Sequence, residues 1–384
     1  MTSNNESARA YAHIRYRVLL IDLAISLAFL LTLQMTGWSQ AIARWWSDRV
    51  HAEPLIVLGY LASIGPSSYL IKFPLHCYSS FHLEHRFGLS RMTLGRWGIK
   101  ELKQIGLSAA LGIVIIEALY ALLRHAPARW PLWATIGWVG FSIVLTRVFP
   151  TVLLPIFYKT TPMQDASLTQ RLLALCKRVR VPALGVFQFR LGAETRKANA
   201  ALAGLGKTRR ILLSDTLLAE FTPDEIEGVL AHELAHHRYH HLLLMLGLST
   251  LGSWIAFTLT ATVGQRWVEA FGLRGLDDIG GFPVLMTWFS LLSFAGLPIQ
   301  HGISRALEWQ ADCFAIANSQ QPQAFASALR RLAQLNLADP SPPRWIVWLF
   351  YDHPPITERI HATEKPVIRR FRQDGIDGLT DRRN

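Results

Sequence analysis

The chain has 384 residues, of which 51% are hydrophobic and 17% are charged, and 39 Lys and Arg against 27 Asp and Glu give it a net charge of +12. Soluble globular proteins have about a quarter of their residues charged, so this composition excludes intrinsic disorder and indicates long apolar segments. Three widely spaced cysteines, Cys77, Cys176 and Cys313, exclude a disulfide-stapled secreted domain. We expect them to be reduced thiols.

Six apolar runs are long enough to cross a bilayer, whose hydrocarbon core requires about 20 helical residues. In chain order, they are 18–38, 54–71, 105–123, 130–158, 242–263 and 281–300. The first run is too long for a cleaved signal peptide, so we expect it to remain as a membrane anchor. Asp22, Glu117 and Arg147 lie inside these runs. They indicate either a water-filled interior or side chains that snorkel from helix ends.

Basic residues concentrate in alternate loops. The amino-terminal tail holds Arg9, Arg15 and Arg17, and the loop after the second run holds six more, whereas the alternating loops hold two each. This bias places both termini and the segment 159–241 in the cytoplasm. We attribute the net charge to this topology and to attraction by anionic membrane lipids. We do not expect nucleic-acid binding, because no basic stretch is interleaved with aromatic residues.

The polar segment between the fourth and fifth runs predicts a small α/β unit. Helical periodicity covers 167–179. Three short strands are predicted at 185–191, 198–202 and 210–213. The glycine-rich stretch 204–208 lacks the first glycine and the following helix of a phosphate-binding loop, so we interpret it as a hairpin turn.

The next helix has a clear beginning. Thr222 and Glu225 are spaced as a capping box, and Pro223 occupies the first helical position, where a missing N–H has no cost. The sequence therefore predicts a helix from about Pro223.

An H-E-x-x-H motif lies ten residues into this helix. Residues four apart share a helical face, so His232 and His236 can reach one metal ion, with Glu233 beside it. A catalytic Zn²⁺ takes three protein ligands and keeps a fourth position for water, whose pKa it lowers to about 7. Glu233 would then act as the general base. This is the arrangement of a zinc peptidase.

A third ligand is available just after the sixth apolar run. Glu308 and Asp312 repeat the four-residue spacing on a predicted helix. Glu308 could complete the metal site, and Asp312 could hold the ring N–H of a ligand histidine. The alternative is a surface helix on which these acids form salt bridges with Arg305.

Three more histidines, His237, His240 and His241, follow the motif. We interpret them as marking the headgroup boundary, where the motif helix continues directly into the apolar run at Leu242; a metal-binding tract is the alternative. His236 lies six residues before Leu242, which predicts a metal site only about 9 Å from that boundary.

The sequence resembles the type I CaaX prenyl proteases, a family of integral-membrane zinc metalloproteases. The resemblance covers nearly the whole chain and extends well beyond the zinc motif. The other segments that carry it are 84–90, 93–94, 154–159, 199–200, 210–217, 304–312 and 353–360. The eukaryotic members have one more span at the amino end, so we count six spans here and expect a bacterial homologue in the inner membrane.

The resemblance implies a metal site and a fold. Zn²⁺ would be bound by His232, His236 and Glu308, with Glu233 as the general base. The membrane helices would enclose a large hydrated chamber that the active site faces. The fold class is therefore an all-α integral membrane protein, with six predicted transmembrane helices around an internal chamber and a small cytoplasmic α/β zincin-like unit.

The resemblance also implies substrate-handling residues. Asn199 and Ala200 resemble the family's edge strand, on which an extended peptide binds through main-chain hydrogen bonds. His353 and Arg359 match positions near the active site, and we assign Arg359 to substrate binding. Our hypothesis for His353 is stabilisation of the tetrahedral oxyanion, against the alternative of a histidine that caps a turn.

Two departures from the family's sequence pattern leave open whether the substrates are prenylated. The family's aromatic residues after the Asn-Ala pair are replaced by Ala201, Leu202 and Ala203, and an insertion ahead of the zinc motif is absent. Neither departure affects the predicted catalytic residues.

We predict a membrane-embedded zinc metalloendopeptidase that hydrolyses an extended peptide or protein substrate, whether membrane-associated, lipidated or neither. The predicted division is 1–158, 159–241, 242–300 and 301–384. The alternatives are a broad-specificity quality-control protease and a non-catalytic scaffold with a structural metal. A structural site usually has four closed ligands, and only three are visible. A transporter is disfavoured because the sequence shows no internal repeat.

Overall fold

The computed structural model describes residues 2–204, 209–319 and 321–364. Within these residues, six helices are long and apolar enough to cross a membrane. They are α1 (Thr2–Met35), α3 (Glu53–Cys77), α5 (Leu94–His125), α6 (Trp130–Val148), α11 (His241–Ala270) and α12 (Phe282–Asn318). The six predicted spans are confirmed. Five of these helices are longer than the apolar run that predicted them, whereas α6 ends at Val148, before the predicted end at residue 158.

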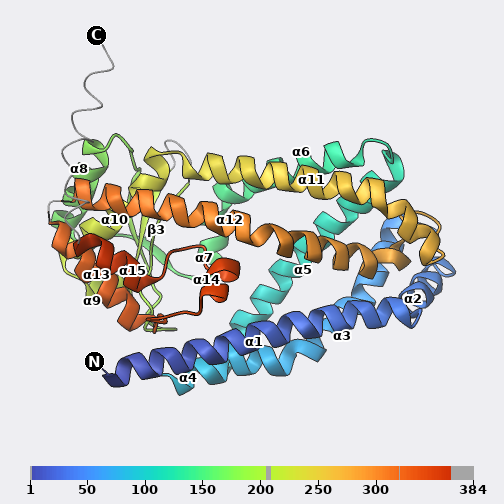
Figure 1. Ribbon diagram of the computed structural model, residues 1–384, viewed down its shortest axis with the longest axis horizontal. Coiled ribbons are helices and arrows are strands. Elements are labelled where there is room, and N and C mark those ends of the chain that lie inside the picture. The colour runs from blue at the N-terminus through green and yellow to red at the C-terminus, as the bar shows by residue number, and fades with distance from the viewer. Residues whose placement is uncertain (1, 205–208, 320, 365–384) are drawn as a thin grey trace, which may run out of the picture.

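The membrane helices form an elongated bundle (Figure 1). Helices α1 and α3 lie together along one side, α11 and α12 along the other, and α5 crosses between them (Figure 1). The outer surface of the bundle is apolar. Leu251 and Val114, for example, are both more than half exposed. Apolar side chains exposed on all sides of such helices are expected to face lipid.

A cavity of about 950 Å³ lies between α1, α3 and α5, at the end of the bundle that meets the sheet. Asp22 and Lys72 line it and form an ion pair at 3.0 Å. His76 and Glu101 form a second pair in its wall at 2.9 Å. Charged residues inside a membrane bundle are tolerated where they pair with each other and face a cavity, and Asp22 does both, which favours the hydrated interior over snorkelling for this residue.

The polar unit contains a sheet of four strands in the order β1-β2-β4-β3. The strands are β1 (Thr160–Pro162), β2 (Gly185–Phe189), β3 (Ala200–Ala203) and β4 (Arg210–Ser214). The three predicted strands are present as β2, β3 and β4. The fourth strand, β1, was not predicted, because it has only three residues and ends in a proline, too short for any alternation. β3 pairs antiparallel with β4, as a hairpin requires, but residues 205–208 of the predicted turn lie outside the described residues.

The motif helix α10 (Pro223–Arg238) packs against the sheet and two neighbouring helices, α8 (Ala166–Arg178) and α13 (Pro322–Leu335). Both hydrogen bonds of the predicted capping box at Thr222 and Glu225 are present. Leu172, Ile211 and Leu230 are fully buried in the core that these elements share. This core holds α10 at a fixed position beneath the sheet.

The predicted continuity of the motif helix with the membrane helix is wrong. α10 ends at Arg238, and His240 takes a left-handed conformation with φ of 57° before α11 begins at His241. α12 instead continues without interruption from its membrane segment to Asn318, across the predicted boundary at 300. The division into four regions remains a proposal.

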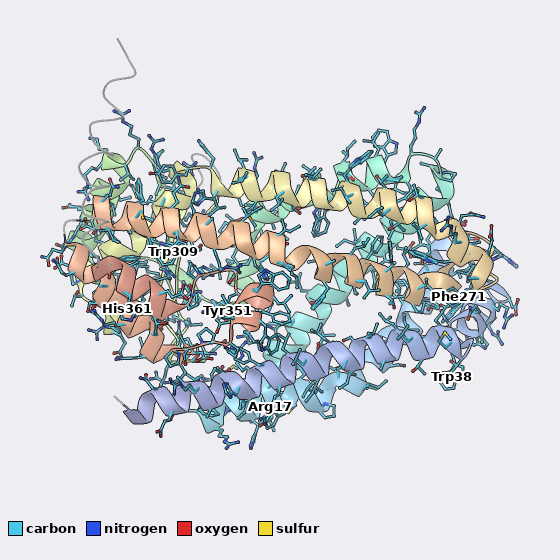
Figure 2. All side chains as sticks on the ribbon, viewed as in Figure 1. Arg17, Trp38, Phe271, Trp309, Tyr351 and His361 are labelled. Atoms are coloured by element: carbon cyan, nitrogen blue, oxygen red, sulfur yellow. The ribbon has the colours of Figure 1, made fainter. Side chains whose placement is uncertain are left out.

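The other α-helices of the described residues are shorter. They are α2 (Trp38–Ser47), α4 (Leu83–Arg86), α7 (Leu154–Phe157), α9 (Asp215–Glu220), α14 (Arg344–Phe350) and α15 (Ile356–Glu364). The amino terminus, the sheet and α10 lie at one end of the molecule (Figure 1). Trp38 and Phe271 lie at the opposite end from Trp309 and His361 (Figure 2). The predicted tail after residue 364 lies outside the described residues.

Candidate active site

Helices α10 and α12 pack together and bring the three predicted metal ligands to one point. One ligand atom each from His232, His236 and Glu308 lies within 4.8 Å of the others. The Nε2 atoms of the two histidines are 3.3 Å apart. The carboxylate oxygens of Glu308 lie 3.2 Å from His232 Nε2 and 3.3 Å from His236 Nε2.

This cluster has the chemistry of a metal site. Glu308 Oε2 is buried and has no hydrogen-bond partner among the described residues. A bare carboxylate oxygen in a protein interior is costly unless a cation or a donor satisfies it. Two imidazoles and one carboxylate are the donor set of catalytic zinc sites, so the residues present fit a divalent metal.

Asp312 and Arg359 lie behind His232. Asp312 Oδ1 is 2.9 Å from His232 Nδ1, which is the contact predicted for it. Arg359 donates two hydrogen bonds to Asp312, at 2.6 and 2.8 Å, and is only 8% exposed. The predicted substrate contact of Arg359 stays a prediction, whereas its observed contacts are to the metal site.

The two histidines differ in their affinity for protons. Burial opposes protonation of His232, but the adjacent carboxylates of Asp312 and Glu308 outweigh burial and raise its pKa to about 9. Burial and then the neighbouring charge of His232 lower the pKa of His236 to about 4. In the metal-free site, therefore, His232 is positively charged at neutral pH and His236 is a neutral imidazole.

Glu233 and His353 complete the predicted catalytic set. Burial raises the pKa of Glu233, and it does so against the attraction of His232. A carboxyl group with a raised pKa is suited to accept and return a proton near neutral pH. His353 Nε2 lies 3.4 Å from Glu308 Oε1, and His353 Nδ1 hydrogen-bonds to Asp352 at 2.8 Å. The structure thus brings His353 from the chain end to the metal cluster, and its role stays a prediction.

Strand β3 is an edge of the sheet. Asn199 O accepts a hydrogen bond from Ser214 N at 3.0 Å, so its main chain faces β4. Because main-chain groups alternate in direction along an antiparallel strand, those of Ala200 and Leu202 face the free edge. Leu202 O is already occupied, since it lies 2.9 Å from His237 Nε2. Ala200 therefore presents its N–H and C=O to the free edge near the metal cluster.

Sequence reasoning missed the contacts of His237 and His241. Both were grouped with His240 as markers of the headgroup boundary, yet His237 contacts β3 and His241 contacts His236. Gln310 contacts His241, and no sequence pattern indicates this contact. No spacing rule identifies these contacts, because they depend on the break between α10 and α11.

Two protein-family models match this chain, and together they span nearly all of it. One, described as CAAX prenyl protease N-terminal with five membrane helices, matches residues 2–159. The other, peptidase family M48, matches residues 162–367. The apolar helices, the H-E-x-x-H helix and these matches define a metalloprotease embedded in a membrane. More particularly, the chain belongs to peptidase family M48.

Relatives with similar sequences are named as proteases. The protein named Uncharacterized metalloprotease YhfN of Bacillus subtilis is 25% identical over 93% of this chain and 85% of its own length. CAAX prenyl protease 1 of Saccharomyces cerevisiae is 28% identical over 82% of this chain and 72% of its own. The crystal structure of S. mikatae Ste24p superposes with a TM-score of 0.86 at 25% identity, covering 95% of this chain and 90% of that one.

Proposed function

We propose that this protein is a zinc metalloendopeptidase that hydrolyses a peptide bond in an extended segment of its substrate, as CaaX proteases do. The observation that carries the proposal is the convergence of two imidazoles and a carboxylate, with Glu233 on the same helix as both imidazoles. The non-catalytic scaffold and the quality-control protease are not favoured by the comparisons.

His232, His236 and Glu308 would hold the metal. Zinc bound there would supply a Lewis acid that polarises the scissile carbonyl and acidifies a water molecule. Glu233 accepts a proton from the attacking water and returns it to the leaving amine, which its raised pKa favours. His353, beside Glu308, donates a hydrogen bond to the developing oxyanion.

The substrate would lie as an added strand along β3. Ala200 offers one N–H and one C=O to such a strand. Hydrogen bonds to these two main-chain groups can form whatever side chains the substrate carries. His237 occupies Leu202 O and would limit the pairing at that end of β3. Arg359 is proposed to act on the substrate indirectly, by fixing Asp312 behind the ligand His232.

The substrate class is proposed from the relatives. Several of them are named CAAX prenyl proteases, so a carboxyl-terminal lipidated peptide is one candidate, and an unmodified membrane-associated peptide is the other. We place the protein in the bacterial inner membrane with the active site toward the cytoplasm, on the basis of its basic loops. Membrane lipids are the other expected partners, and nucleic acid is not expected.

The proposal is tested by Glu233→Gln in purified protein in detergent. The unaltered protein and the variant are each assayed against a farnesylated CaaX peptide and an unmodified peptide, with and without a zinc chelator. We expect the variant to retain metal and fold yet lose cleavage by at least about 100-fold, the usual range for general base catalysis. Cleavage that persists in the variant and resists the chelator would refute the proposal.

A further inference from the structure

His241 contacts the ligand histidine His236 although the two residues lie on different helices. The Nδ1 atoms of the two rings are 3.0 Å apart. On its other side, His241 Nε2 is 2.9 Å from Oε1 of Gln310, a residue of α12 two positions after Glu308. His241 is only 4% exposed, so its ring is enclosed by these neighbours.

The break between α10 and α11 makes this contact possible. In a continuous helix, residues five apart point about 140° away from each other, so His241 could not face His236. The chain avoids this by ending α10 at Arg238 and turning through a left-handed His240. Such a conformation costs about 1 to 2 kcal/mol for a residue other than glycine. A strained turn that buries the next side chain against a metal ligand points to a function for that side chain.

The hydrogen-bond roles along this chain of groups are fixed by the metal site. His236 directs Nε2 toward the cluster, 3.3 Å from Glu308 Oε1, so as a metal ligand it carries its proton on Nδ1. That proton needs an acceptor, and the facing atom is His241 Nδ1. His241 must then carry its own proton on Nε2, where the carbonyl oxygen of Gln310 accepts it. One assignment of protons therefore satisfies all four atoms.

We propose that His241 is a positioning residue of the metal centre, which fixes the ring orientation and the proton of His236 and is itself held by Gln310. The inference rests on the proposed function only in that it takes His236 as a metal ligand. Each ligand histidine then has its own partner, a carboxylate behind His232 and an imidazole behind His236. Partners of this kind orient ligands and tune affinity. The first residue of the membrane helix α11 is therefore in contact with a metal ligand.

Two substitutions at His241 separate this role from simple packing. His241→Leu keeps an apolar body and removes the acceptor, whereas His241→Asn places an amide oxygen near the position of Nδ1. The zinc dissociation constant is measured by competition with a chromophoric chelator, and the absorption spectrum of the Co²⁺-substituted protein reports ligand geometry. We expect His241→Leu to bind zinc about 10- to 100-fold more weakly with an altered Co²⁺ spectrum. We expect His241→Asn to stay within about threefold of the unaltered protein.

His51 is exposed in the loop between α2 and α3, and α2 lies at the end of the molecule opposite α10 (Figure 1). It provides the control His51→Leu, which should bind zinc normally. Equal affinity and an unchanged spectrum in His241→Leu would overturn the inference. If His241→Leu does not fold, Gln310→Met is measured instead, because residue 310 is exposed, and a smaller loss in the same direction is expected. A normal spectrum and affinity in Gln310→Met would overturn it equally. Failure of the unaltered protein to bind zinc through His236 would instead refute the proposed function.

Discussion

Asp312 is the residue on which the geometry of His232 depends most. It is buried between His232 and the guanidinium of Arg359, and both of its oxygens are hydrogen-bonded. A buried carboxylate in this setting can compensate the arginine charge and hold the imidazole at the same time. Its removal should therefore affect metal binding before it affects the remainder of the fold.

We predict that Asp312→Asn weakens zinc binding by about 10- to 100-fold, because the amide keeps the size of the side chain but loses its charge. The chelator-competition assay measures the loss. Asp277→Asn, an exposed position at the other end of the molecule, is the matched control and should bind zinc normally. Unchanged affinity in Asp312→Asn would show that Asp312 has no part in the metal site.

The raised pKa of His232 predicts how the free energy of unfolding of the metal-free protein depends on pH. Its pKa of about 9 in the folded chain exceeds its ordinary value of 6.5. Protonated His232 therefore stabilises the fold fully below pH 6.5, and this contribution is lost as the pH rises through about 9. It amounts to at most about 3 kcal/mol. The unfolding midpoint of chelator-treated protein should fall between pH 6.5 and 9 by more than in His232→Gln, and equal falls would contradict the assignment.

At the scale of elements, α10 was the most predictable part of the fold. Its first turn is specified by three neighbouring residues, Thr222, Pro223 and Glu225. Their capping interactions are local, so they depend little on how the rest of the chain packs. The end of α10 could not be predicted, since His240 adopts a left-handed conformation that is uncommon for any residue other than glycine. Strand β1 was missed because tertiary pairing with β2, and not its own pattern, makes Thr160–Pro162 a strand.

We predict that Thr222→Ala destabilises the protein by about 1 kcal/mol, because the first turn of α10 loses its capping hydrogen bond. The unfolding midpoint should fall by about 2 °C. Ser167→Ala, an exposed position in the first turn of α8, is the control and should leave the midpoint unchanged. A fall of the same size in both variants would argue against the capping box as a stabilising feature.

The edge strand β3 predicts a two-residue period in the substrate. If the peptide pairs with Ala200, only alternate peptide N–H groups face β3. A series of peptides, each N-methylated at one successive residue, should therefore show raised KM at alternate positions only. The unmethylated peptide is the reference for each assay. A uniform rise along the series, or none, would contradict strand addition at this edge.

At the scale of the whole molecule, the sequence predicted the six spans and the grouping of His232, His236 and Glu308, because apolar length and helical spacing are local properties. Apart from the contact of Asp312 with His232, it could not predict which contacts form where helices meet. Asp22 pairs with Lys72 from a different span, and His241 reaches Gln310 across two helices. Pairings of this kind depend on how the helices pack, and the packing cannot be inferred from the sequence of any single segment.

The arrangement of the helices predicts the membrane sidedness of the site. The amino terminus lies at the same end as α10, and the loop at Asp48 lies at the other end (Figure 1). In a background with the three natural cysteines replaced by alanine, we expect an impermeant thiol reagent to label Asp48→Cys in intact cells. Glu6→Cys should react only after permeabilisation. The reverse pattern would place the active site outside the cytoplasm.

The central claim is that His232, His236 and Glu308 together hold one catalytic metal. X-ray absorption at the zinc edge of the purified protein tests it most directly, because it counts imidazole neighbours and distinguishes oxygen from sulfur. We predict one zinc per chain with two imidazoles and otherwise oxygen ligands, and loss of bound zinc in Glu308→Ala. A site with sulfur ligands, with four imidazoles, or unchanged by Glu308→Ala would contradict the account.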